Sequence, residues 1–86
     1  MRVISFTQDG FKEFVEWSEN DKAISAKLKD LIKEILRDPF KGKGKPEPLK
    51  GELKGYWSRR INEEHRLIYE VGESYILIIK CKGHYK

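Results

Sequence analysis

Residues 39–50, PFKGKGKPEPLK, contain one acidic side chain, Glu47, among four lysines. Pro46 and Pro48 flank this glutamate, and proline restricts both its own φ and the backbone of the residue before it. The carboxylate therefore stands on a stiff, extended segment of a surface loop. A carboxylate held among cations is suited to act as a general base beside an anionic substrate. The alternative is a surface acid that only keeps a lysine-rich loop soluble.

A base of this kind could serve in the cleavage of RNA. An RNA 2′-hydroxyl must lose its proton to attack the adjacent phosphorus, and Glu47 could accept that proton. The extra negative charge on phosphorus requires a fixed donor, which arginine supplies bidentately and lysine only as a point charge. The leaving 5′-oxygen needs a proton, which histidine can carry near neutral pH. This chemistry needs no metal and no other cofactor, and no cysteine–histidine pair has zinc-binding spacing.

Positive charge is concentrated around Glu47. The chain has a net charge of +4, and residues 39–60 contain seven lysine and arginine residues against two glutamates. This segment therefore accounts for the whole excess. A basic region of this kind favours a polyanionic partner such as nucleic acid or an acidic protein. The alternative is a solvated loop that has no partner.

The elements that must position these residues begin with a strand and two helices. Residues 1–6 predict a strand. Thr7 can cap a helix that ends near Asn20, Asp21 can cap the next, and Pro39 ends the second helix. Each helix has an apolar face, formed in the first by Phe11, Phe14 and Val15 and in the second by Ile24, Leu28, Leu31, Ile32 and Ile35.

Three strands follow the basic loop, because the apolar pattern changes there to a period of two. We expect them at residues 53–62, 66–71 and 75–81, joined by short polar turns. The order β-α-α-β-β-β predicts one α+β domain over residues 1–86. Its mostly antiparallel, twisted sheet should carry the two-helix hairpin on one face and leave the other face open.

Side chains that alternate along each strand are assigned to one face or the other. Leu67, Tyr69 and Val71 form an apolar set that should face the helices. If no bulge intervenes, the last strand presents to the same face Tyr75, Leu77, Ile79 and Cys81. The open face, over which the Glu47 loop can fold, then receives Arg60, Arg66, Lys82 and His84.

Several other residues predict structure rather than chemistry. His65 adjoins the turn between two strands, and we expect it to have a structural role there. Cys81 is the only cysteine, which excludes an internal disulfide, and its apolar surroundings predict a core position. Trp17 and Trp57 should be core or interface anchors. No apolar run approaches the ~20 residues of a membrane span, and no signal peptide is present, so we expect a cytoplasmic protein.

Three motifs occur in order along the chain. They are GKGKPEPLK at residues 42–50, WSRRI-x-EEHRL-x-Y at residues 57–69, and a His-Tyr pair at residues 84–85. With these motifs the chain closely resembles the YoeB/Txe family of bacterial toxin–antitoxin systems, in the RelE superfamily, over nearly its whole length. The resemblance implies a RelE-like fold and a toxin that inhibits translation. It also implies ribosome-dependent cleavage of mRNA in the ribosomal A site, with 2′,3′-cyclic phosphate and 5′-hydroxyl products.

The resemblance assigns roles and partners. It implies Glu47 as general base, Arg66 as the phosphate-stabilising arginine and His84 as general acid, with Arg60 and Tyr85 in the same site. Further RNA contacts are expected from Lys45, Lys50, Lys82 and Arg59. The implied partners are a YefM/Axe-like antitoxin, the 30S A site with its ribosomal RNA and mRNA, and a second copy in a homodimer.

Two other functions are compatible with this sequence. One is a toxin of the same fold that poisons gyrase, against which the combination of Glu47, Arg66 and His84 argues. The other is a basic RNA-binding module that carries out no chemistry. The nature of the cleaved nucleic acid and of its new ends would distinguish the three.

Overall fold

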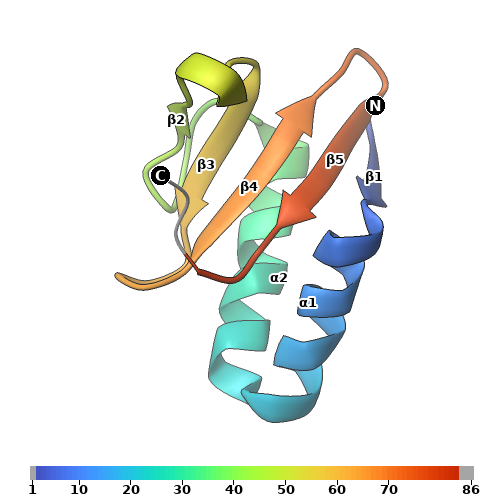
Figure 1. Cartoon of the computed structure of the whole chain (residues 1–86), viewed down its shortest axis with the longest axis vertical. Helices are drawn as coiled ribbons and strands as arrows, with labels where there is room; N and C mark the ends of the chain where they lie inside the picture. The colour runs from blue at the N-terminus through green and yellow to red at the C-terminus, as the bar shows by residue number, and fades with distance from the viewer. Residues whose placement is uncertain (1, 84–86) are drawn as a thin grey trace.

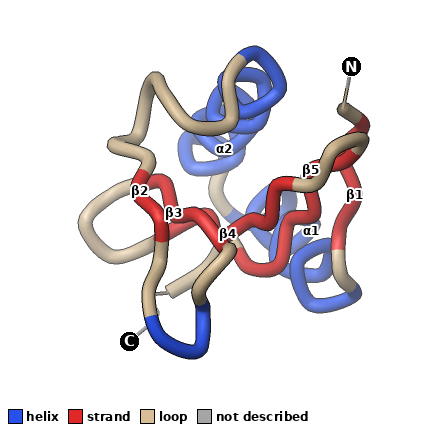
Figure 2. The backbone as a smooth tube through the Cα atoms, turned by 90° about the horizontal axis from the view of Figure 1, so that it is seen from above, coloured by secondary structure: helices blue, strands red, loops and turns tan. Residues whose placement is uncertain are grey.

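Five strands and two α-helices are found in residues 2–83, the part of the chain that the computed structural model describes. In chain order they are β1 (Val3–Phe6), α1 (Gln8–Asn20), α2 (Lys22–Arg37), β2 (Glu47–Pro48), β3 (Tyr56–Arg60), β4 (Arg66–Val71) and β5 (Tyr75–Lys80), with a 3₁₀ turn at Gly51–Leu53. The strands form one sheet in the order β1-β5-β4-β3-β2. Only the β1–β5 pair is parallel. Figure 2 shows the strands following one another across the molecule.

Both helices begin and end where the sequence predicts. The Thr7 hydroxyl accepts a hydrogen bond from the Gly10 amide at 3.0 Å, and the Asp21 carboxylate accepts one from the Ile24 amide at 3.1 Å. These caps satisfy amide groups that have no partner within the helix. The second helix ends at Asp38, whose amide donates to the Glu34 carbonyl oxygen, and the following proline cannot continue it.

The core lies between α2 and the sheet, and Figure 1 shows the upper part of α2 passing behind β4. Leu28, Leu31 and Ile35 of α2 are fully or almost fully buried. They belong to one cluster with the strand residues Ile61, Leu67, Tyr69, Ile76 and Ile78. The predicted α+β architecture and the apolar face of α2 are therefore confirmed. In α1 the prediction is less accurate, because Phe11 is 55% exposed, although its ring makes a T-shaped contact with that of Phe6.

One strand of the sheet was not predicted. Residues 47–48 form β2, a two-residue strand that pairs with β3 at the edge of the sheet. Proline is tolerated there because an edge strand leaves one side unpaired, where a missing N–H removes no ladder bond. The predicted strand at residues 53–62 is shorter than expected, because a 3₁₀ turn occupies its beginning.

The predicted faces of the last strand are wrong over its first residues, up to a bulge. Tyr69 pairs with Ile78, but Ile68 pairs with Lys80, so β5 holds one extra residue at that point. An extra residue moves the side chains that follow it to the opposite face. Ile76 and Ile78 stand before the extra residue, on the core face with Tyr69, and are fully buried, so the core prediction for Tyr75, Leu77 and Ile79 is wrong. Cys81 is fully buried as predicted.

In the described residues, neither helix has the length and the apolar character needed to cross a membrane.

Burial raises the pKa of the Cys81 thiol to about 12, with the Glu13 carboxylate acting in the same direction. Burial also raises the pKa of Tyr69.

These raised pKa values predict a loss of stability at high pH. Above pH 9 the Cys81 thiol ionises in the unfolded chain but stays protonated in the folded one, so the free energy of unfolding should fall between pH 9 and about 12. Urea denaturation at pH 7 and pH 10.5 measures this fall. The variant Cys81→Ala lacks the thiol and should lose less stability than the wild type over the same interval. An equal loss in both proteins would contradict the prediction.

Candidate active site

The register of three strands places the predicted base and two arginines on one face of the sheet. Glu47 of β2 pairs with Ser58 of β3, and Arg60 of β3 pairs with Arg66 of β4. Directly paired residues, and residues two apart in one strand, point to the same face. Glu47, Arg60 and Arg66 therefore share the face opposite the α2 core, as Figure 1 allows the reader to follow along β2, β3 and β4.

The spacing of these residues fits one phosphodiester. Neighbouring strands lie ~4.8 Å apart and two residues of a strand span ~6.8 Å, so the α-carbons of Glu47 and Arg66 should be about 12 Å apart. A span of this size has room for a phosphate and its ribose between the two residues. Glu47 and Arg60 are exposed, and neither side chain makes a hydrogen bond or ion pair with the described residues. Their charges are therefore available to a ligand.

Arg66 is the first residue of β4 and directly follows the turn that joins β3 to β4. Its guanidinium Nη1 donates to the carbonyl oxygens of Asn62, Glu63 and His65. The backbone amide of Arg66 donates to the carbonyl oxygen of Gly83 at 3.0 Å. The last described residue is therefore held beside the arginine. His84 and Tyr85, for which catalytic and RNA-binding roles were predicted, lie outside the described residues.

Arg59 does not take the RNA-binding role predicted for it. Its side chain is fully buried on the opposite face of β3 from Arg60. The guanidinium donates to the Tyr69 hydroxyl at 3.0 Å and to the carbonyl oxygens of Asp38, Lys41 and Lys43, at 2.6, 3.0 and 3.0 Å. The Tyr69 hydroxyl in turn donates to the Pro39 carbonyl oxygen at 2.7 Å. Arg59 therefore fixes the start of the basic loop from inside the protein.

Backbone contacts continue this support along the loop towards Glu47. The Arg60 amide donates to the Gly44 carbonyl oxygen at 2.6 Å. Gly44 has φ +85°, and a β-carbon there would lie about 3 Å from Leu31, Arg59 and Arg60 atoms. Glycine is required at this point both for the left-handed backbone and for the close approach. Lys45 follows at φ +50° and is exposed, as is Lys50 beyond Glu47.

Lys82 does not join the face of Arg66 as predicted. Its ammonium lies 3.7 Å from the Glu16 carboxylate of α1 and 5.5 Å from the centre of the Trp17 ring. The prediction failed because Lys82 follows the end of β5 at Lys80, where the alternation of a strand no longer decides the face of a side chain. Trp17 and Trp57 both pack against the core cluster, as predicted.

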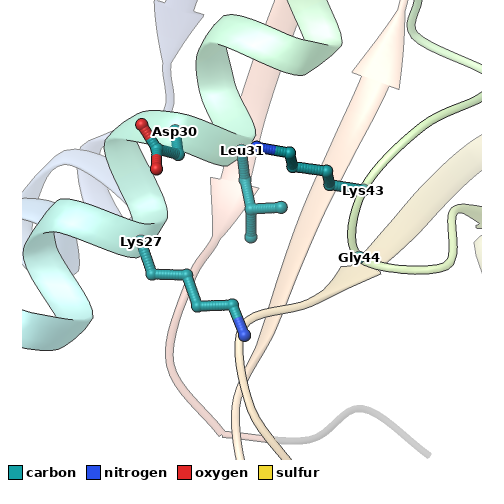
Figure 3. A pocket seen from close by; sticks show the side chains of 5 residues that line it. All are labelled: Lys27, Asp30, Leu31, Lys43 and Gly44. Atoms are coloured by element: carbon teal, nitrogen blue, oxygen red, sulfur yellow. The ribbon is translucent and has the colours of Figure 1, made fainter.

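A hollow of about 590 Å³ lies on the helix side of the same loop. Figure 3 shows Leu31 reaching between the side chains of Lys27 and Lys43. Asp30 and Gly44 complete the lining. Neither Glu47 nor Arg66 lines this hollow, so the open face of the sheet remains the candidate site.

Comparison with known proteins identifies the family. The model of the family described as "YoeB-like toxin of bacterial type II toxin-antitoxin system" matches residues 6–85. This chain belongs to that family. The YoeB-like chain is 50% identical over 85 residues to Toxin YoeB of Escherichia coli K12, covering 99% of this chain and all of that one. It is 48% identical over 85 residues to Toxin RelK of Mycobacterium tuberculosis, with the same two coverages.

Solved structures agree with this assignment. The YoeB/ParE toxin from Agrobacterium tumefaciens superposes with a TM-score of 0.94 at 42% identity, covering 99% of this chain and all of that one. A YoeB dimer from Staphylococcus aureus has a TM-score of 0.90 at 45% identity, with 98% of each chain covered. A YoeB–YefM complex from the same organism matches at 0.90 and 43% identity, with 99% of each covered. The predicted RelE-like fold of this YoeB-like toxin is confirmed.

Two residues that support the site in this YoeB-like chain were not recognised from the sequence. Tyr69 was expected only as an apolar core residue, yet its hydroxyl links Arg59 to the loop. His65 was given a structural role at the turn, but its partner, Gly83, was not foreseen. Both belong to the motif at residues 57–69, so the clustering of polar residues in an otherwise apolar strand pair was the available signal.

The buried guanidinium predicts a difference between two neighbouring arginines. Arg59→Lys replaces a planar donor fork by one ammonium, which cannot reach the same four oxygens, so about 2–4 kcal/mol of unfolding free energy should be lost. The same change at the exposed Arg60 should alter stability by less than about 0.5 kcal/mol. Urea denaturation of both variants tests this difference. Equal stabilities would show that the Arg59 network is unimportant.

Proposed function

We propose that this YoeB-like toxin is a ribosome-dependent endoribonuclease that cleaves mRNA in the ribosomal A site and so stops translation. The observation that carries the proposal is the strand register that puts Glu47, Arg60 and Arg66 on one open face. Gly83, which directly precedes His84 in the sequence, is held beside Arg66 by its backbone hydrogen bonds. RNA transesterification needs a base, a donor for the charge on phosphorus and an acid. The Glu47 carboxylate, the two guanidinium groups and the imidazole of His84 can fill these roles.

Each group has a defined role in the proposed reaction. The Glu47 carboxylate accepts the proton of the ribose 2′-hydroxyl, whose oxygen attacks phosphorus. Arg66 binds the negative charge that develops on the non-bridging oxygens. His84 gives its proton to the 5′-oxygen as the P–O bond breaks. The products are a 2′,3′-cyclic phosphate and a 5′-hydroxyl, and these residues carry out the reaction without a metal ion or cofactor.

The surrounding cations provide affinity for RNA. Arg60 and the exposed Lys45 and Lys50 stand on or beside the Glu47 face and would bind phosphates of mRNA or ribosomal RNA. Tyr85 would stack on a base. Arg59 and Lys82 are not included, because one is buried and the other is turned towards α1. With a ribosomal target, the toxin acts in the cytoplasm.

Two protein partners complete the proposal. A YefM-like antitoxin should bind this toxin, because the S. aureus relative forms a YoeB–YefM complex and superposes closely on this chain. The S. aureus YoeB dimer likewise supports a homodimer here. The net charge of +4 favours an antitoxin segment that carries acidic residues.

Removal of the proposed base should abolish most cleavage. Glu47→Gln keeps the size of the side chain but not its basicity, so ribosome-coupled mRNA cleavage should fall ~10²–10⁴-fold. The cleavage rate of the variant Arg66→Lys should fall ~10²–10³-fold, because the bidentate donor is lost. Glu52→Gln changes an exposed acid of the same segment and serves as the control. Mapping the RNA ends in a translation reaction measures both rate and end chemistry.

Three outcomes of that assay would contradict the proposal. Cleavage at the wild-type rate by Glu47→Gln would remove the carboxylate from the mechanism. Cleaved DNA with intact mRNA would indicate a toxin that poisons gyrase. RNA binding without new cyclic-phosphate ends would indicate a binding module that has no chemistry.

The antitoxin proposal predicts a thermal shift. A ligand that binds only the folded state stabilises it by about 2.7 kcal/mol when present at one hundred times its Kd. The melting temperature should therefore rise by several degrees when the product of the neighbouring antitoxin gene is added, and the shift should grow with its concentration. An unrelated antitoxin of similar net charge is the control. An equal shift with both would show that only charge is recognised.

A further inference from the structure

The peptide unit of Gly83 is held on both sides. Its N–H donates to the Nδ1 atom of His65 at 2.8 Å, and its carbonyl oxygen accepts from the Arg66 amide at 3.0 Å. Gly83 has φ +79°, a conformation that side chains with a β-carbon rarely adopt. His65, at the end of the turn, and Arg66, the first residue of β4, therefore fix Gly83, the last described residue.

The imidazole of His65 is itself held in place. Its side chain is only 13% exposed. The ring packs edge-on against Trp17, with 4.8 Å between ring centres, and the Trp17 indole N–H donates to the Cys81 carbonyl oxygen at 2.8 Å. The His65 amide donates to the Asn62 side-chain oxygen at 2.7 Å. The Nδ1 atom that accepts the Gly83 hydrogen bond is therefore fixed in position. Because the lone pair on Nδ1 accepts this bond, the proton of the neutral ring is on Nε2.

We propose that His65 is a positioning residue, which fixes the point from which the chain continues into residue 84 by accepting the Gly83 amide hydrogen bond. The proposal rests on the proposed function, in which His84 is the general acid. Since His65 holds the Gly83 N–H and Arg66 holds its carbonyl oxygen, the residue before the proposed acid is tied to the arginine that carries the phosphate-binding guanidinium and to its neighbour. A short chain end without this support would sample many positions, and a displacement of ~1 Å can cost ~10²-fold in rate.

Two substitutions separate the acceptor from the ring. His65→Asn keeps an acceptor atom on Cγ, where Nδ1 is attached, but removes the ring. His65→Phe keeps a ring against Trp17 but has no acceptor. If the acceptor matters, His65→Phe should lower mRNA cleavage roughly 10- to 100-fold, while His65→Asn should stay within a few-fold of wild type. His65→Leu also lacks the acceptor and replaces His65→Phe if that variant does not fold.

Amide hydrogen exchange at Gly83, followed by NMR, gives a readout that is independent of RNA cleavage. Exchange should be roughly 2- to 10-fold faster in His65→Phe than in wild type and close to wild type in His65→Asn. The nitrogen chemical shifts of the wild-type imidazole should show an unprotonated Nδ1.

The combined results support or overturn the proposal as follows. Loss of cleavage and of Gly83 protection in His65→Phe, with both retained in His65→Asn, supports it. Wild-type cleavage by His65→Phe overturns it, as does an equal loss in both variants with similar melting temperatures. If the wild type itself does not cleave mRNA, the proposed function fails first and the positioning role fails with it. If the wild type is active and His65→Phe is equally active, only the positioning role is overturned and the proposed function stands.

Discussion

The buried guanidinium of Arg59 is the interaction on which the rest of this structure depends. A charge without contact to water costs several kcal/mol unless hydrogen bonds replace its hydration. Here four oxygens do so, one from Tyr69 and three from the backbone between Asp38 and Lys43. The loop is rich in glycine and lysine, and its residues 41–45 have no apolar side chain with which to fold against the core. Its carbonyl groups are instead bound from inside, so the loop is fixed by polar contacts.

The position of Glu47 follows from this anchoring. Once the loop is bound to β3 through Arg59, and through the bond from the Arg60 amide to Gly44, the next residues meet the free edge of β3 and pair with it as β2. Neighbouring arginines on one strand thus have opposite tasks, because alternate side chains point to opposite faces. Arg59 holds the loop from the core side, and Arg60 carries an unneutralised charge on the face of Glu47.

Most of the architecture could be predicted because it depends on local patterns. Thr7, Asp21 and Asp38-Pro39 mark the helix ends by capping and by the loss of an N–H donor, and α2 has an unbroken apolar stripe. The failures occurred where tertiary contacts override the pattern. Pairing with β4 turned Ile76 and Ile78 to the core in place of the predicted residues of β5, and Lys82, beyond the end of that strand, lies against α1. Arg59 was taken as a surface cation because sequence gives no sign that three carbonyl groups and a phenol surround it.

By itself, the sequence determined the order of the elements, the concentration of positive charge around Glu47 and the motifs that define the family. These features are read from neighbouring residues, since capping, periodicity and charge need no knowledge of distant contacts. Only the tertiary structure decided which arginine faces the solvent, which side β5 shows to the core, and that His65 meets Gly83. Each of these depends on strand register, and a shift of one residue in register exchanges the two faces of a strand.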